Sequence, residues 1–172
     1  MYNIGDNILY GMSGVMTVLD VRQEKILGEE KTYYVLCEQG GKSTSLTYVP
    51  VENDKLTASM HPLLTASEAR EAVSAARSCP DLDWMEDSRA RAEYYRGVLR
   101  SADRCRILVM IRTIHNTGLR RAEMGKKNFL TDENIMRKAE GLIAREFSIS
   151  LGITQDQVHE IIRDDVKGER GV

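Results

Sequence analysis

One segment of the chain concentrates side chains suited to binding an anion. Between Ser88 and Arg121 the sequence has nine arginines and no lysine, opposed only by Glu93 and Asp103, which gives a formal charge of +7. The whole chain has a net charge of −2, so the rest is acidic. The planar guanidinium matches phosphate oxygens in a two-pronged geometry. The segment therefore predicts a site for a negatively charged partner. Its arginines are Arg89, Arg91, Arg96, Arg100, Arg104, Arg106, Arg112, Arg120 and Arg121.

Helical periodicity places part of this charge on one side of a helix. At 100° per residue, Arg89, Arg96 and Arg100 fall opposite an apolar face that includes Tyr95 and Val98. One interpretation is a solvated helix face that packs against the acidic N-terminal region. The charge imbalance and the exclusive use of arginine instead favour nucleic acid, which such a face binds without sequence preference and with steep salt dependence.

Trp84, the only tryptophan, precedes this helix and has two interpretations. The stretch Asp83-Trp84-Met85-Glu86 has the form of a capping box, which predicts a helix that starts at Trp84. On that helix the indole falls near the apolar face and would belong to the core. In a first turn it could equally project as a wedge or stacking platform for bases.

Catalysis and metal binding have little support in the sequence. No Ser, Cys or His stands in a recognisable nucleophile setting, and no glycine loop could cradle phosphate. The cysteines at 37, 79 and 105 are too far apart for metal-ligand spacing. We expect no catalytic residue, no cofactor, no metal and no small-molecule substrate. Unpaired thiols and the lack of a signal peptide or long apolar run predict a cytoplasmic protein without membrane contact.

The first fifty residues predict strands joined by short turns. Apolar alternation begins at Ile4 and covers Ile8 and Tyr10, and further strands are expected at Val15–Val21, Thr32–Cys37 and Ser43–Val49. Polar or glycine-bearing turns are expected at Gly11–Gly14, Leu27–Lys31 and Glu38–Lys42. Such a short meander predicts a Tudor- or SH3-like antiparallel β-barrel.

Beyond Asn53 the pattern becomes helical, with a break at His61-Pro62. Helices are expected to start at Thr65 or Ser67, at Trp84, near Asp103, at Thr131 and at Thr154, with Gly152 as a stop and a polar tail after Lys167. The prediction is an α+β chain of two domains. The first covers residues 1–58 and the second, all-α, covers residues 59–172.

The order of several short motifs resembles the CarD/CdnL family of bacterial transcription regulators, whose N-terminal domain is similar to the polymerase-interacting domain of transcription-repair coupling factors. In the first domain these motifs are Ile4-Gly5-Asp6, Tyr10-Gly11, Gly14-Val15, Ile26-Leu27-Gly28-Glu29, Tyr33-Tyr34-Val35-Leu36 and Val49-Pro50-Val51. In the second they are Trp84, Leu99, Ser101, Asp103, Ala139, Leu142 and Glu146.

The resemblance implies a Tudor-like domain that docks on the RNA polymerase β subunit and a helical domain that contacts double-stranded promoter DNA. Trp84 matches a tryptophan that wedges into the minor groove at the upstream edge of the bubble and stabilises the open complex. Arg89, Arg91, Arg96 and Arg100 would then contact DNA phosphates.

For the polymerase contact the resemblance points to Glu24, Lys25 and Tyr48, of which Glu24 and Tyr48 stand where some members carry a basic residue. Two hypotheses follow. The first is a non-enzymatic, DNA-binding transcription regulator. The second is a polymerase-binding adaptor in which Trp84 is a core residue and the basic helical domain binds an acidic protein partner.

Overall fold

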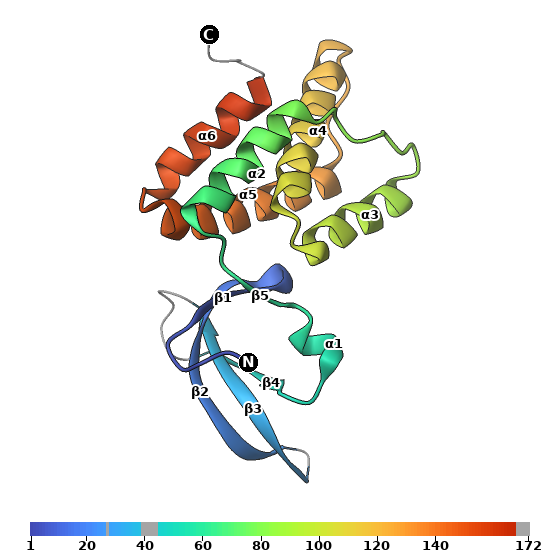
Figure 1. The fold of residues 1–172 in the computed structure, drawn as a ribbon. Helices are drawn as coiled ribbons and strands as arrows, with labels where there is room; N and C mark the ends of the chain where they lie inside the picture. Colours follow the sequence, from blue (N-terminus) through green and yellow to red (C-terminus); the bar gives the residue numbers. More distant parts are fainter. Residues whose placement is uncertain (27, 39–44, 168–172) are drawn as a thin grey trace. The chain divides into compact units, whose positions relative to one another are not determined.

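The computed structural model describes residues 1–26, 28–38 and 45–167 (Figure 1). The chain divides into two compact units, Met1–Leu63 and Leu64–Val172. An antiparallel sheet forms the first unit and α-helices form the second, so the predicted α+β architecture is confirmed. The predicted turn at Glu38–Lys42 and the predicted tail after Lys167 lie, apart from Glu38 and Lys167 themselves, outside the described residues.

In the part of the chain that the structure describes, the sheet contains five strands in the order β4-β3-β2-β1-β5, and adjacent strands are antiparallel. Among the described residues no pairing joins β4 to β5, so the sheet keeps two edges where a closed barrel was expected. Because β5 is only three residues long and pairs with β1 alone, it leaves β4 without a partner on its outer side. The strands are β1 (Asn7–Tyr10), β2 (Gly14–Ile26), β3 (Glu29–Glu38), β4 (Leu46–Pro50) and β5 (Met60–Pro62).

Two short helical segments connect the strands. The 3-10 helix η1 (Gly11–Ser13) lies between β1 and β2, and α1 (Asp54–Thr57) follows β4. Gly14 ends η1 with φ of 93°, a conformation that favours glycine, which explains the predicted break there. Alternating residues of the strands then point to one buried cluster, made by Ile8, Met16, Val18, Tyr34, Leu36, Val49 and Met60.

The described part of the helical unit contains five helices, of which three pack around a central pair. α4 and α5 pack together, and α2, α3 and α6 each contact both (Figure 1). Buried residues at the centre include Tyr95, Leu99, Leu108, Ile111, Ile143 and Phe147. No described helix is both long and apolar enough to cross a bilayer. The helices are α2 (Ala66–Ser78), α3 (Ser88–Ser101), α4 (Arg104–Glu123), α5 (Leu130–Leu151) and α6 (Gln155–Lys167).

Most predicted helix ends are confirmed by the capping contacts. Thr65 and Glu68 form a reciprocal capping box before α2. Asp103 caps α4 by accepting a hydrogen bond from the Arg106 amide at 3.0 Å. Thr154 accepts from the Gln157 amide at 3.2 Å, and Gly152 ends α5 with φ of 66°.

Two predicted helix starts were wrong. α3 begins at Ser88, because Asp87 accepts a hydrogen bond from the Ala90 amide at 2.7 Å. The carbonyls of Met85 and Glu86 accept hydrogen bonds from the Arg91 guanidinium. These bonds keep residues 79–87, here called the Trp84 segment, outside the helix. α5 begins at Leu130 after Phe129, without a side-chain cap, so Thr131 lies within its first turn.

Candidate nucleic-acid and protein interfaces

Arg91 is the most deeply buried of the predicted DNA contacts. Its side chain is only 1% exposed, and its Nε donates to Asp132 Oδ2 on α5 at 2.8 Å. Its Nη1 donates to the Met85 carbonyl at 2.6 Å. The guanidinium therefore stabilises the interior of the helical unit. This corrects the prediction that Arg91 contacts phosphate, because reaching DNA would require breaking a buried ion pair.

Two further arginines of the basic segment are also buried in ion pairs. Arg104 donates from Nε to Glu146 Oε2 at 2.9 Å and from Nη2 to Glu146 Oε1 at 2.7 Å, joining α4 to α5. Arg112 donates from Nε to Asp81 Oδ1 at 2.8 Å and so ties α4 to the segment after α2. All three carboxylates that neutralise buried arginines lie outside residues 88–121. The positive charge that residues 88–121 place on the protein surface is therefore lower than their formal charge of +7.

Helical spacing carries a signal for the buried arginines that composition hides. Arg91, Tyr95 and Val98 are spaced i, i+4 and i+7, so they share one face of α3, and all three are buried. Arg104 and Leu108 share a face of α4 in the same way. Counting charge over the segment missed these positions, whereas the apolar period would have identified Arg91.

The exterior of α3 carries three of the arginines that remain accessible to solvent. Arg89 and Arg100 are exposed, and the Arg96 side chain is 43% exposed. Glu93 accepts from Arg100 Nη2 at 2.6 Å and lies 3.8 Å from Arg96 Nη1. The predicted arrangement of Arg89, Arg96 and Arg100 on one outward face of the helix is thus present, with one carboxylate between two of its members.

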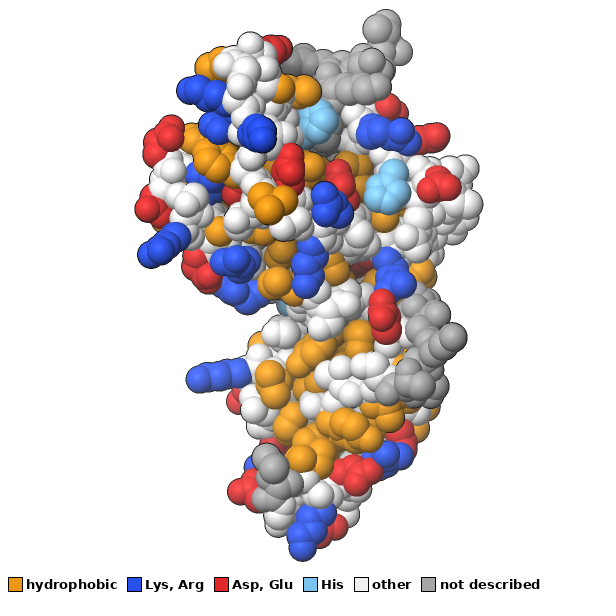
Figure 2. Space-filling view, turned by 180° about the vertical axis from the view of Figure 1, so that it is seen from behind, with side chains coloured by type: hydrophobic (Ala, Val, Ile, Leu, Met, Phe, Trp, Pro, Cys, Tyr) orange, Lys and Arg blue, Asp and Glu red, His pale blue; other side chains and the backbone are white. Residues whose placement is uncertain are grey.

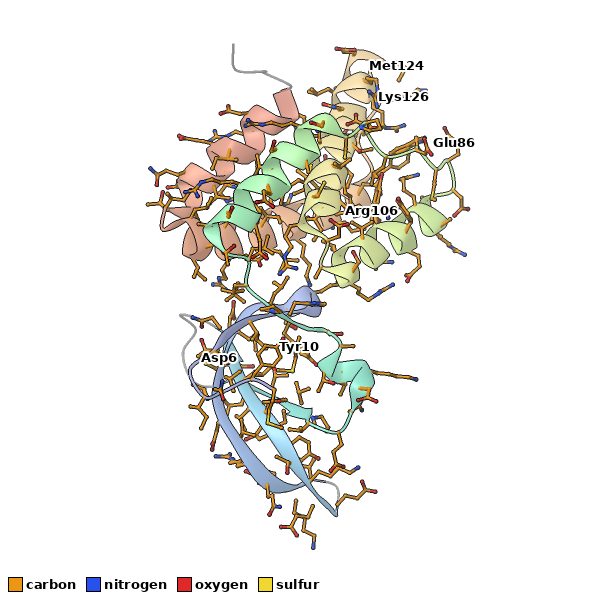
Figure 3. The ribbon with its side chains drawn as sticks, viewed as in Figure 1. Asp6, Tyr10, Glu86, Arg106, Met124 and Lys126 are labelled. Atoms are coloured by element: carbon orange, nitrogen blue, oxygen red, sulfur yellow. The ribbon has the colours of Figure 1, made fainter. Side chains whose placement is uncertain are left out.

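Two other exposed basic side chains lie near the two ends of α4. Arg106 is exposed near the start of α4 and donates from Nη2 to the Tyr94 hydroxyl at 2.8 Å. Lys126 lies just beyond the opposite end of α4 (Figure 3). Figure 2 shows lysine and arginine side chains over the visible face of the helical unit, interspersed with hydrophobic and acidic ones.

Trp84 occupies a position between the two predicted extremes. It is half-buried in the segment between α2 and α3, and its ring centroid lies 5.9 Å from that of Phe129. The Arg91 guanidinium carbon lies 4.1 Å from the Trp84 centroid, and Arg121 lies 4.0 Å from that of Phe129. Such contacts combine packing with cation–π attraction. The indole is therefore held in place while part of it faces solvent.

A cavity of about 150 Å³ adjoins this aromatic cluster, lined among others by Trp84, His115, Phe129 and Asp132. Burial raises the pKa of the Asp132 carboxyl, while the hydrogen bond and the charge of Arg91 act in the opposite direction. The cluster is thus a packed support for Trp84 with a small hollow beside it.

The predicted polymerase contacts lie on β2 and β4. Arg22, which sequence analysis missed, connects two of them: its Nε lies 2.9 Å from Glu24 Oε1 and its Nη2 donates to the Tyr48 hydroxyl at 3.4 Å. Glu24 and Tyr48 therefore share one face of the sheet. Lys25 is exposed and follows Glu24 directly, so its side chain leaves the opposite face. Arg22 and Glu24 are two residues apart on one strand, and this spacing could have shown from the sequence that their side chains lie on the same face.

The chain is an α+β protein in which a small antiparallel-sheet unit is followed by a helical unit. Residues 2–64 match the family model described as CarD-like/TRCF RID domain, which spans the first compact unit. This unit is similar to that family, and the resemblance found in the sequence is confirmed over these residues. The domain implies an interaction with RNA polymerase. No curated protein matches the chain.

Proposed function

We propose that the chain is a non-enzymatic transcription regulator that docks on the RNA polymerase β subunit through its sheet and contacts promoter DNA through its helical unit. The observation that carries this proposal is the match of residues 2–64 to the CarD-like/TRCF RID domain. The helical unit would place Trp84 at the upstream edge of the transcription bubble. There it would hinder bubble collapse and stabilise the open complex.

The outward arginines of α3 support the DNA contact. Arg89, Arg96 and Arg100 are spaced i, i+7 and i+11, so they recur on one side of the helix. They span about 16 Å along the axis at 1.5 Å per residue, which is roughly the rise of five base pairs. A row of that length suits successive phosphates of one DNA backbone, and Arg106 offers a further cation beside it.

The setting of Trp84 supports a role as a rigid aromatic contact. Arg91 and Phe129 fix one side of the indole, so little conformational freedom is lost when the exposed part meets a base step. Partial unstacking of a base step by an inserted side chain costs a few kcal/mol, which the additional contacts offset. The basic row on α3 would supply these contacts.

The polymerase contact is assigned to the sheet face that carries Tyr48 and Glu24. Tyr48 lies on β4, an edge strand, and Arg22 holds Tyr48 and Glu24 in one polar group. Lys25 would reach the partner only around the end of the β2–β3 hairpin. We therefore expect Tyr48→Ala to weaken binding to the β subunit more than Lys25→Ala does.

A second function is also consistent with the structure, because Glu93 already neutralises part of the charge of Arg96 and Arg100. In that case the sheet binds polymerase and the helical unit binds an acidic protein partner, as in an adaptor. The two functions differ in whether DNA is a ligand of the full chain.

The deciding experiment measures association of the full chain with RNA polymerase and with a forked promoter fragment, separately and together. The DNA-binding regulator predicts that the chain binds the fork with an affinity that falls steeply with salt and joins a ternary complex with polymerase. Binding to polymerase without any salt-dependent DNA affinity would support the adaptor. Failure to bind polymerase would overturn both.

A further inference from the structure

Two cysteines that are distant in sequence meet in the helical unit. Cys79 is the residue that follows α2, and Cys105 is the second residue of α4. Both line one cavity of about 650 Å³, together with Met85 and Val109. The two side chains lie close enough for Cys79 to raise the pKa of the Cys105 thiol. Cys79 is exposed and Cys105 is half-buried, so one thiol of the pair faces reagents in solution.

A buried polar network fixes this pairing. Cys105 and Arg112 are seven residues apart, so they lie on the same face of α4. Arg112 donates from Nη2 to the Cys79 carbonyl at 2.5 Å and from Nη1 to the Ala76 carbonyl at 2.8 Å. The main chain of Cys79 is therefore anchored on the face of α4 that carries Cys105. The juxtaposition of the thiols depends on packed helices, not on an unconstrained loop.

We propose that Cys79 and Cys105 form a reversible disulfide when the protein meets hydrogen peroxide. The Cys79 sulfur attacks one peroxide oxygen, the O–O bond breaks, and Cys79 becomes a sulfenic acid as the first water leaves. The Cys105 sulfur then attacks the Cys79 sulfur, the S–O bond breaks, and a second water leaves. The two thiols lose two protons and two electrons, which reduce the peroxide to water.

The environments of the two thiols assign their order of reaction. Burial, followed by the neighbouring Cys79, raises the pKa of the Cys105 thiol to about 11, so little of it is thiolate at neutral pH. Cys79 has the accessible sulfur and reacts first, and Cys105 resolves the sulfenic acid. The resulting bond closes a covalent loop that contains Trp84 and all of α3. This inference does not depend on the proposed function.

The test oxidises the reduced, reductant-free full chain with hydrogen peroxide at low protein concentration and maps the products by mass spectrometry without reduction. We expect a monomer that has lost two hydrogen atoms, with the Cys79 and Cys105 peptides joined and Cys37 still open to alkylation. A thiol reductant should restore both thiols. Cys37→Ser is the matched control and should retain the cross-link, whereas Cys79→Ser and Cys105→Ser should each abolish it.

Three results would overturn the proposal. They are accumulation of sulfinic acid on Cys79 beside a free Cys105, disulfides between chains in place of the internal one, and equal formation of the Cys79–Cys105 bond in buffer and in concentrated urea. The last would show that the fold does not direct the pairing. The peptide map of the wild-type chain decides among these outcomes, whether or not a serine variant folds well.

Discussion

The guanidinium carbon of Arg91 lies 4.1 Å from the centroid of the Trp84 ring, while its Nε donates to Asp132 at 2.8 Å. One buried arginine therefore positions the indole and joins α3 to α5. Arg89, two positions earlier on the same helix, is exposed to solvent. Neighbouring arginines in the basic segment thus have different roles, one internal and one external.

Replacement of Arg91 should destabilise the helical unit far more than replacement of Arg89. Arg91→Met leaves the Asp132 carboxylate buried without its partner, a change that costs about 3–5 kcal/mol in free energy of unfolding. Arg89→Met changes an exposed side chain and should stay within about 0.5 kcal/mol of the wild type. Urea unfolding followed by the helical circular dichroism signal measures both. Equal losses would show that Arg91 is not a structural arginine.

The exposed arginines of α3 should set the salt dependence of DNA binding. Combined replacement of Arg89, Arg96 and Arg100 by alanine leaves up to three phosphates without a cation and should lower the salt slope by about one unit for each of these phosphates. Binding to a promoter fragment across a salt titration gives the slope. Replacing Arg70 and Arg77 on α2 provides a control with exposed arginines elsewhere in the unit. An unchanged slope in the α3 variant would remove α3 from the DNA interface.

Glu93 should lower the affinity of α3 for DNA. Its carboxylate accepts from Arg100 at 2.6 Å and lies 3.8 Å from Arg96, so Glu93→Gln frees two guanidiniums for phosphate. We expect DNA affinity at low salt to rise by only roughly two- to fivefold, because exposed ion pairs are weak. Glu160→Gln on α6 makes the same change in net charge. If both variants gain equally, net charge explains the effect and Glu93 has no local role.

Acid should weaken the attachment of the Trp84 segment to α4. Burial raises the pKa of the Asp81 carboxyl, but the hydrogen bonds from Arg112 and Asn116 and the charge of Arg112 lower it more, so its net shift is downward. A carboxyl with a lowered folded pKa stabilises the fold above its unfolded pKa of about 3.9 and loses that contribution as pH falls through the folded value.

Wild type and Asp81→Asn measure this contribution. Their free energies of unfolding should differ by about 1–3 kcal/mol at pH 7, as expected for a hydrogen bond to a charged group. The difference should shrink as the pH falls from about 5 toward 3. A difference that stays constant over this range would mean that the ionised Asp81 carboxylate contributes no stability.

Local chemistry made much of the fold predictable from the sequence. Thr65, Asp103 and Thr154 each stand before an apolar helical period and cap the helix that follows. Strand alternation and the glycine break at Gly11–Gly14 likewise give β1 and β2. Closure of the sheet into a barrel was not predictable, because it depends on whether β5, at one edge, pairs with β4, at the other edge. That is a tertiary property.

The candidate site was only partly predictable. The outward position of Arg89, Arg96 and Arg100 follows from helical spacing alone. The burial of Arg91 depends on Asp132, a residue of another helix, and the Arg91 hydrogen bonds to the Met85 and Glu86 carbonyls then delay the start of α3. A capping box at Trp84 is compatible with the local sequence, but this long-range pair overrides it.

The half-life of a promoter open complex tests the central proposal most directly. It is measured with RNA polymerase alone, with the wild-type chain and with Trp84→Ala, at low and moderate salt. The proposed function predicts a longer half-life with the wild-type chain and a loss of about 1–3 kcal/mol of that stabilisation in Trp84→Ala, with polymerase binding unchanged. Equal half-lives with the wild-type chain and with Trp84→Ala, at full occupancy of polymerase, would contradict it.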